Sequence, residues 1–162
     1  MEQFKTKIYT MGDDIDTDII MPTEYLALPT VEDMKPYAFS PLRQELAGLI
    51  QPGDSIVAGK NFGCGSSREQ APEVIKAMGI RCIVAKSFAR IFFRNSINNG
   101  LLLIESDLCD YVQEGDVMDV TVGKEITVNG NTYPIAALPE NLLEILDAGG
   151  LVPAMRKRNG LE

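Results

Sequence analysis

Short alternations and runs of hydrophobic residues divide this chain into expected strands. Phe4–Thr10 alternates apolar and polar positions, which is typical of a strand with one buried face. Ser55–Ala58, Arg81–Ala85 and Leu101–Ile104 are short apolar runs, as expected of strands that are buried on both faces. A shorter apolar stretch, Ile19–Met21, predicts a further short strand that ends at the following proline.

Segments with helical spacing lie between these runs. A helix is predicted from Ser66 or Ser67 to Gly79, because Ser66 and Glu69 have the spacing of a capping box and glycine commonly ends a helix. Pro72 lies inside this stretch and predicts that the first turn is offset from the rest.

A second helix is predicted to start at a Ser87 cap and to close at Asn99-Gly100. Its apolar face is expected to comprise Phe88, Ile91 and Phe92. Pro41–Ile50 also has helical apolar spacing, and Pro139–Ala148 predicts a last helix.

The order of these elements indicates the fold class. Strand, helix, strand, helix and strand with short connections predict a parallel βαβαβ layer. After Gly115 the pattern changes to short strands, and Asn129-Gly130 is a strong hairpin signal. We therefore expect an α/β fold with a parallel core layer, a C-terminal β-meander and a helix. It is expected to form a single domain over residues 1–162.

The composition excludes several kinds of catalytic site. The chain has no histidine, so it lacks a Ser–His or Cys–His nucleophile pair, an imidazole base and His-ligated zinc. Cys64, Cys82 and Cys109 are far apart and form no Cys-x-x-Cys motif, so they do not hold an iron–sulfur cluster by themselves. The odd, sparse cysteine count and an N-terminus without an apolar signal core predict a soluble, cytoplasmic protein.

The charge is acidic overall but uneven along the chain. Lys and Arg number 15 against 23 Asp and Glu, a net charge of −8, which argues against nucleic acid as a general partner. Residues 60–94 nevertheless contain seven basic and two acidic residues. Two interpretations remain open from the sequence: helix surfaces that are basic by chance, or an electropositive cleft for a small polyanion.

The glycine-rich segment at residues 59–69, GKNFGCGSSRE, is the strongest local motif. It lies between an expected strand and an expected helix N-terminus, where free N–H groups and the positive end of the helix dipole favour an anion. Ser66, Ser67 and Arg68 add two hydroxyls and a guanidinium suited to a carboxylate or phosphate. The segment does not match the Walker A motif or the dinucleotide fingerprint.

The acidic segment DDIDTDIIMP, residues 13–22, follows the first expected strand. Its four aspartates suggest a cation loop, but the calcium pattern fails because its glycine position is Ile19 and its final glutamate position is Tyr25. An acidic turn with Asx-type caps is favoured over a metal site. Cys64 is interpreted as a packing residue, and Cys82 and Cys109 as buried hydrophobic residues.

Taken together, DDIDTDIIMP, GKNFGCGSSREQA and AKSFARIFFRNSINNGL resemble, in order and spacing, the swivelling domain of the aconitase superfamily. The similarity is strong from about Asp14 to Gly100 and looser beyond. Among free chains of this size, it is greatest to the small subunits of the superfamily's isopropylmalate and homoaconitate enzymes. The resemblance implies a single swivelling β/β/α-type domain.

The resemblance also implies a mechanism and a partner. In such enzymes a large subunit carries a four-iron four-sulfur cluster, and the small subunit closes over a small dicarboxylate substrate. By similarity, Ser66 is the catalytic base, and Ser67 and Arg68 contact a substrate carboxylate. Thr17 and Asp18 match the residues of the first loop that orient the site. Gln70 stands where many members have histidine, which leaves the base in place.

The loop Tyr25-Leu26-Ala27-Leu28 bears on the substrate. Members that accept a tricarboxylate resemble Tyr-Leu-Arg here, and the arginine pairs with the extra carboxylate. Ala27 and Leu28 would leave that carboxylate unpaired, which is costly in a closed site. The resemblance therefore implies isomerisation of isopropylmalate, as in leucine biosynthesis, over homoaconitate or citrate. Methylmalate and dimethylmalate follow the same logic and are not separated by the sequence.

Two other classes of function remain open from the residues alone. One is a non-catalytic anion-binding module that holds phosphate or a carboxylic acid at the glycine-rich loop. The other is a purely structural partner subunit. Neither nucleic acid nor a membrane is an expected partner, and no cofactor is expected on this chain itself.

Overall fold

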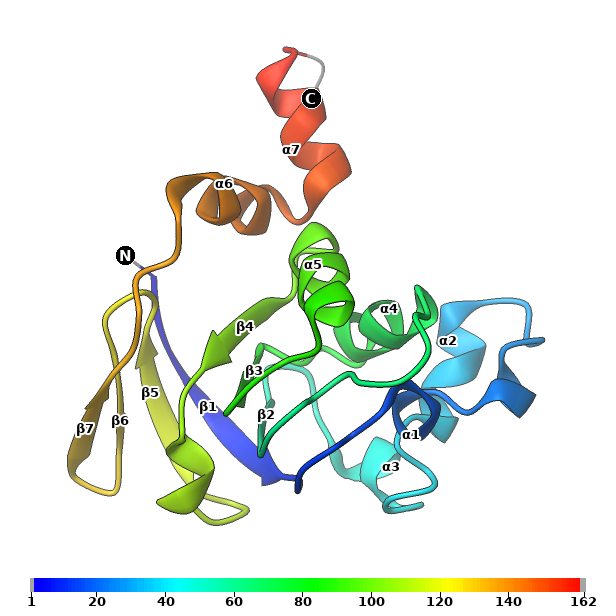
Figure 1. Ribbon diagram of the computed structural model, residues 1–162, viewed down its shortest axis with the longest axis horizontal. Coiled ribbons are helices and arrows are strands. Elements are labelled where there is room, and N and C mark those ends of the chain that lie inside the picture. The colour runs from blue at the N-terminus through cyan, green and yellow to red at the C-terminus, as the bar shows by residue number, and fades with distance from the viewer. Residues whose placement is uncertain (1, 161–162) are drawn as a thin grey trace.

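The computed structural model describes residues 2–160, so the outermost residues of the predicted domain, 1 and 161–162, lie outside the described residues. A seven-stranded sheet in the order β4-β3-β2-β1-β5-β6-β7 forms its centre (Figure 1). The strands are β1 Gln3–Thr10, β2 Ser55–Ala58, β3 Cys82–Ala85, β4 Leu102–Glu105, β5 Val117–Thr121, β6 Glu125–Val128 and β7 Asn131–Pro134.

Strand β1 joins the two parts of the sheet. It pairs in parallel with β2, Ile8 opposite Ser55, and antiparallel with β5, Phe4 opposite Val120. The parallel layer then continues through β3 and β4, and the antiparallel part through β6 and β7. The predicted parallel layer and β-meander are both confirmed, and the turn between β6 and β7 is the predicted Asn129-Gly130 pair, with φ of 53° and 78°.

Seven α-helices and three 3₁₀ helices lie within residues 2–160. The α-helices are α1 Thr17–Ile20, α2 Val31–Met34, α3 Leu46–Leu49, α4 Gln70–Ala77, α5 Arg90–Asn98, α6 Glu140–Ala148 and α7 Leu151–Arg158. The 3₁₀ helices are η1 Thr23–Tyr25, η2 Lys35–Tyr37 and η3 Leu108–Asp110. No helix in this part of the chain is long and apolar enough to cross a bilayer.

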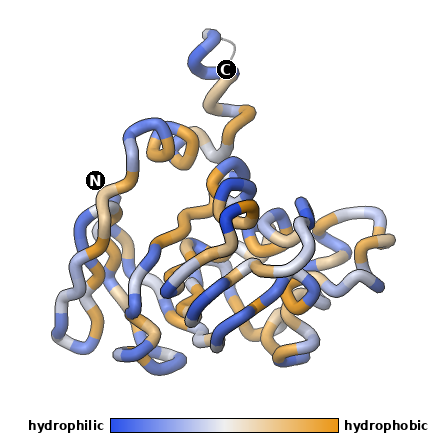
Figure 2. Tube along the Cα trace, viewed as in Figure 1, coloured by the Kyte–Doolittle hydropathy of each residue, from blue (hydrophilic) through white to orange (hydrophobic). Residues whose placement is uncertain are grey.

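The parallel strands are buried on both faces, which explains their continuous apolar runs. Ile83 packs into the core cluster that includes residues of α4 and α5. The next residue, Val84, packs into a second cluster with Met118 and Ile126 of the meander. Helices therefore cover one face and the curled meander covers the other. In Figure 2 hydrophobic residues follow the central strands, and the outer end of α7 is hydrophilic.

The segment Ile19–Met21 is not the predicted strand. Asp16 caps the one-turn helix α1, because its carboxylate accepts a hydrogen bond of 2.8 Å from the N–H of Ile19. Ile20 and Met21 are fully buried, so their hydrophobicity serves a helical turn and the residue after it.

Helix α4 begins later than predicted, at Gln70. The residue before it, Glu69, makes no side-chain cap, so the predicted capping box of Ser66 and Glu69 is wrong. Pro72 lies in the first turn, where its missing N–H is not needed for a helical hydrogen bond. The C-terminal end is as predicted, since Gly79 follows the helix with φ of +84°.

Four further differences concern the other helices. Ser87 does not cap α5, because its hydroxyl accepts a hydrogen bond of 2.8 Å from the N–H of Asn61. Ile91 is 58% exposed, although it was expected on the buried face. The helix predicted over Pro41–Ile50 is reduced to α3, and the projecting helix α7 was not predicted at all (Figure 1).

Candidate functional site

The candidate site lies at the carboxyl ends of the parallel strands. There the loops that follow β1, β2 and β3 meet, because parallel strands end at the same edge of a sheet. The N–H of Gly59 donates to the carbonyl of Gly12 at 3.1 Å, and the N–H of Lys86 donates to the carbonyl of Gly59 at 3.0 Å. The first loop and the glycine-rich loop are joined again where Gly63 donates to Ile15 at 2.7 Å.

Gly63 allows helix α5 to approach the glycine-rich loop. Its φ is +83°, a backbone conformation that favours glycine. A Cβ at this position would overlap the Cγ and Cβ atoms of Phe92 on α5. Phe92 is buried and packs edge-on against Phe62 with ring centroids 5.4 Å apart. This glycine therefore sets how closely the helix and the loop pack.

Replacing Gly63 with alanine should lower the free energy of unfolding by about 2–4 kcal/mol. The left-handed backbone and the overlap with Phe92 both oppose a side chain here. Urea denaturation of the purified chain measures the loss. Gly115→Ala is a matched control, because Gly115 has φ of +95° but open space around it, and should cost only about 1 kcal/mol. Equal losses in the two variants would contradict the packing role.

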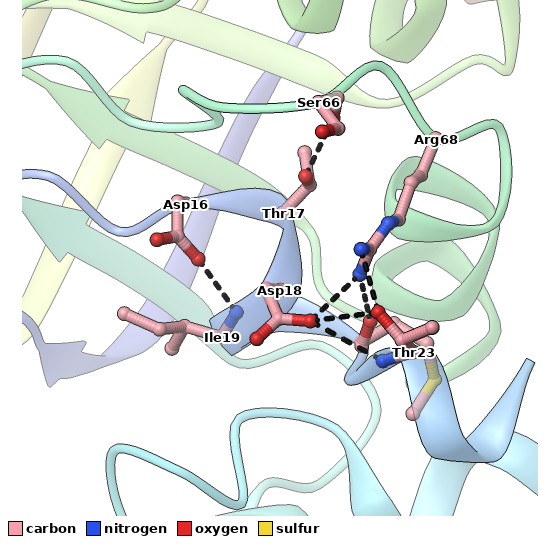
Figure 3. Close-up of polar contacts among 8 residues, drawn as sticks. Asp16, Thr17, Asp18, Ile19, Thr23, Ser66 and Arg68 are labelled. Atoms are coloured by element: carbon pink, nitrogen blue, oxygen red, sulfur yellow. Dashed lines mark hydrogen bonds and ion pairs between the residues drawn. The ribbon is translucent and has the colours of Figure 1, made fainter.

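Thr17 fixes the segment that carries the two serines. Its buried hydroxyl donates to the carbonyl of Ser66 at 2.6 Å (Figure 3). Its N–H donates to the carbonyl of Cys64 at 2.9 Å. The hydroxyls of Ser66 and Ser67 lie in exposed residues and make no hydrogen bond within residues 2–160. Because α4 begins at Gln70, Ser66 does not occupy the helix N-terminus at which the sequence placed it.

Arg68 connects the glycine-rich loop to the segment after α1. Its Nη1 donates to Oδ1 of Asp18 at 3.1 Å and to the carbonyl of Met21 at 2.9 Å. Its Nη2 donates to Oγ1 of Thr23 at 2.7 Å, and the Thr23 hydroxyl donates to Asp18 at 3.0 Å (Figure 3). The hydrogen bond from Arg68, followed by those from Thr23, lowers the pKa of Asp18 below its ordinary value.

These contacts leave one edge of the Arg68 guanidinium free. Of its five N–H groups, three are used by Asp18, Met21 and Thr23 within residues 2–160. Asp18 and Thr23 are hydrogen-bonded to each other, so both lie at the edge of the guanidinium that Nη1 and Nη2 form. The Nε–H and the second Nη2–H remain, and they point in parallel as a carboxylate requires for two hydrogen bonds.

A cavity of about 220 Å³ adjoins Arg68. One wall comes from the two loops and includes Thr17, Ser67 and Arg68, and Ser66 precedes this wall in the chain. The opposite wall comes from the start of α5, whose contribution the sequence analysis did not predict. Its residues are Ala89, Arg90, Ile91, Phe92 and Asn95. A larger cavity of about 340 Å³ lies at the other edge of the sheet and contains none of the predicted site residues.

The loop predicted to set substrate specificity, residues 25–28, closely follows Thr23, whose hydroxyl accepts a hydrogen bond from Arg68. Tyr25, Leu26 and Leu28 are half-buried against the core, and Tyr25 stacks on Tyr37 with ring centroids 4.1 Å apart. Ala27 is exposed. None of the four residues lines the cavity beside Arg68 in this structure.

The aspartates of the first loop are engaged in hydrogen bonds. Asp13 accepts from the N–H of Lys60 at 2.7 Å, Asp14 accepts from Nδ2 of Asn61 at 3.1 Å, and Asp16 caps α1. In residues 2–160 no three Asp, Glu, His or Cys side chains are grouped to hold a metal ion. This arrangement corresponds to the favoured acidic turn.

The cysteines do not fit an iron–sulfur cluster, which needs thiolate ligands. Cys82 is buried as expected, and burial raises its pKa to about 11, whereas Cys109 is only half-buried, contrary to the expectation. Burial, followed by the charges of Asp16 and Asp14, also raises the pKa of Cys64 above its ordinary value. The cysteines of this chain are therefore not proposed as cluster ligands.

Comparison with known proteins gives a consistent result. The Aconitase C-terminal domain family matches residues 50–107, which include the glycine-rich loop, α4 and α5. The 3-isopropylmalate dehydratase small subunit of Lachnospira eligens is 75% identical in an alignment that covers 99% of each chain. The isopropylmalate/citramalate isomerase small subunit of Methanocaldococcus jannaschii is 43% identical over 95% of this chain and 94% of its own. A crystal structure of 3-isopropylmalate dehydratase from Methanocaldococcus jannaschii has a TM-score of 0.92 and 39% identity, with 98% of this chain and 96% of that chain covered.

Proposed function

The chain belongs to the family of 3-isopropylmalate dehydratase small subunits, and on this premise we propose that with a large subunit it interconverts 2-isopropylmalate and 3-isopropylmalate. The observation that carries the proposal is the convergence of two distant loops on one group, which consists of two exposed serines and a half-buried arginine. The segment after β1 brings Thr17 and Asp18, and the segment after β2 brings Ser66, Ser67 and Arg68.

The proposed reaction is a dehydration followed by a rehydration. Ser66, in its anionic form, takes a proton from the carbon next to a carboxylate, the C–H electrons form the C=C bond, and the hydroxyl leaves the neighbouring carbon as hydroxide. Hydroxide then adds to the carbon that lost the proton, and Ser66 returns the proton to the carbon that lost the hydroxyl, so the hydroxyl has moved by one carbon. The positive charge of Arg68 favours the anionic form of the nearby serine that removes the proton.

The remaining residues are proposed to hold the substrate and its base in place. Arg68 offers its free edge to a carboxylate, and Ser67 adds a hydroxyl on the same wall. Thr17 positions the backbone of Ser66, and Asp18 positions the guanidinium of Arg68. Asp18 stays ionised because Arg68 lowers its pKa.

The large subunit is proposed to complete the site. Ser66 and Ser67 are exposed at the sheet edge, so this chain provides one wall, and the partner would exclude water by closing over it. A four-iron four-sulfur cluster of the large subunit is the expected Lewis acid for the substrate hydroxyl. We further propose that residues 1–162 form one domain, supported by the single continuous sheet, and that the enzyme works in the cytoplasm.

Citramalate, which is 2-methylmalate, is a second candidate substrate, because the Methanocaldococcus jannaschii relative is called an isopropylmalate/citramalate isomerase small subunit. The test is to purify this chain together with its large subunit and to follow the absorbance of the alkene acid. We expect turnover of 3-isopropylmalate to exceed that of citramalate and of homocitrate. A preference for citramalate would replace the proposed substrate. No dehydration of any of the three would contradict the proposed function.

Changing Ala27 to arginine tests the specificity loop. Ala27 is exposed, so the fold should tolerate the change, and the new guanidinium is expected to favour a substrate with a third carboxylate. We expect kcat/KM for 3-isopropylmalate to fall by about tenfold and homocitrate dehydration to appear. Ala27→Gln, which adds length without charge, is the control and should not admit homocitrate. An unchanged substrate preference in the arginine variant would contradict the proposal that this loop sets substrate specificity.

A further inference from the structure

We propose that Arg90, the first residue of α5, binds a carboxylate of the substrate across the cavity from Arg68, with Asn95 as a second hydrogen-bond donor. This inference rests on the proposed function and adds a wall of the substrate site that the sequence motifs do not identify. Both residues line the cavity of about 220 Å³ that Ser67 and Arg68 also line.

Charge is the first reason to assign Arg90 to the substrate site. Arg68 is paired with the more exposed Asp18, so part of its positive charge is already compensated before a substrate binds. Arg90 is exposed and forms no ion pair within residues 2–160. A substrate with two carboxylates needs positive charge beyond a compensated pair, and Arg90 is the cavity residue that supplies it.

Most other cations of the basic segment 60–94 are already engaged. Arg81 pairs with Glu2, Lys86 pairs with Asp110, and Lys76 donates to the carbonyl of Gly149 at 2.8 Å. Lys60 and Arg94 are exposed and do not line the cavity. The basic segment therefore contributes to the cavity through Arg68 and Arg90.

The position of Arg90 is the second reason to assign it to the substrate site. The N–H of Ala89 donates to the carbonyl of Phe62 at 2.9 Å, and the N–H of Phe62 donates to the carbonyl of Ser87 at 3.0 Å. Phe92, in the first turn of α5, packs against Phe62 and Gly63. The backbone of Arg90 is therefore fixed to the glycine-rich loop, and only its side chain must move to reach a ligand.

Asn95 lies on the same face of α5 as Ile91, four residues earlier. It is half-buried, and its side-chain amide forms no hydrogen bond within residues 2–160. Its NH₂ group can donate to a carboxylate oxygen without breaking an existing contact. The α5 wall thus offers a charged donor at its start and a neutral donor one turn further on.

The experiment compares wild type, Arg90→Gln, Arg90→Lys and Arg94→Gln in the complex with the large subunit. Arg94 is the matched control, because it is an exposed arginine one turn along the same helix but outside the cavity. We expect Arg90→Gln to raise KM for 3-isopropylmalate about tenfold or more, with a smaller effect on kcat. Arg90→Lys should retain part of the affinity, and Arg94→Gln should match wild type.

Two further measurements separate the possible outcomes. Calorimetry with isopropylsuccinate, a dicarboxylate without the hydroxyl, should show the same loss of affinity in Arg90→Gln. Sedimentation should show unchanged assembly with the large subunit. If Arg90→Gln behaves like Arg94→Gln, or weakens assembly while KM stays unchanged, the inference is overturned. An inactive wild-type complex would instead refute the proposed function, and the calorimetric comparison would still decide whether Arg90 binds a dicarboxylate.

Discussion

Replacing Ser66 with alanine is expected to lower the turnover of 3-isopropylmalate about 10³-fold, because it removes the proposed base. The hydroxyl of Ser66 is exposed and forms no hydrogen bond within the described residues, so the fold should not depend on it. The contact with Thr17 uses the carbonyl of Ser66, which alanine retains. The free energy of unfolding should therefore change by no more than about 0.5 kcal/mol.

The measurement is the rate of alkene-acid formation by the variant complex at saturating substrate. Ser67→Ala is the matched control, since it removes the neighbouring exposed hydroxyl and should mainly raise KM. Assembly of both variants with the large subunit is checked by gel filtration. Near-normal turnover by a well-assembled Ser66→Ala complex would remove Ser66 as the base.

Replacing Arg68 with lysine is expected to lower kcat/KM for 3-isopropylmalate about 10²-fold. Lysine keeps the charge but loses the parallel Nε–H and Nη2–H pair that is proposed to bind a carboxylate. It also lacks the geometry to hold Asp18, the Met21 carbonyl and Thr23 together. Two lost charge-assisted hydrogen bonds account for a change of about this size.

Two readouts separate binding from structure in the Arg68 variant. Thr23→Val removes one neighbour of the guanidinium but leaves its free edge, so it should affect kcat/KM far less. A carboxyl NMR titration of the Arg68→Lys variant should show that the pKa of Asp18 rises towards its ordinary value, because the strongest hydrogen bond that lowers it is gone. An unchanged kcat/KM in Arg68→Lys would contradict the proposed carboxylate contact.

The pKa of Asp18 has a consequence for acid stability. The folded state lowers this pKa, so the contribution of Asp18 to stability is present above the unfolded-state pKa. It is lost as the pH falls through the folded-state pKa. The contact between Arg68 and the segment after α1 should therefore persist at neutral pH and loosen only in acid.

The sheet and the glycine-rich loop were predictable because they depend on local pattern. Buried strands such as Ser55–Ala58 have continuous apolar runs, and Asn129-Gly130 specifies its own turn. The helix boundaries were less predictable, because Asp16 competes for backbone N–H groups and turns Thr17–Ile20 into a helix. The same difficulty applies to Ser66 and Ser87, which have the spacing of N-cap residues but do not cap α4 and α5.

The part of the candidate site that the sequence did not predict depends on tertiary packing. Arg68 was expected to bind a ligand, but its contacts with Met21 and Thr23 join segments about 45 residues apart and have no local signal. Arg90 belongs to a predicted helix, yet its place in the cavity follows from the packing of Phe92 against Gly63. The surplus of basic residues in segment 60–94 was the available signal for this wall.

The most direct test of the divided active site is a titration of the large subunit with this chain while 3-isopropylmalate dehydration is followed. The proposed function predicts no turnover by either chain alone and activity that rises until the two subunits are equimolar. Adding the Ser66→Ala chain should give the complex with turnover lowered about 10³-fold. Full activity of the large subunit alone, or equal activity with wild type and Ser66→Ala, would contradict the claim that this chain contributes the base.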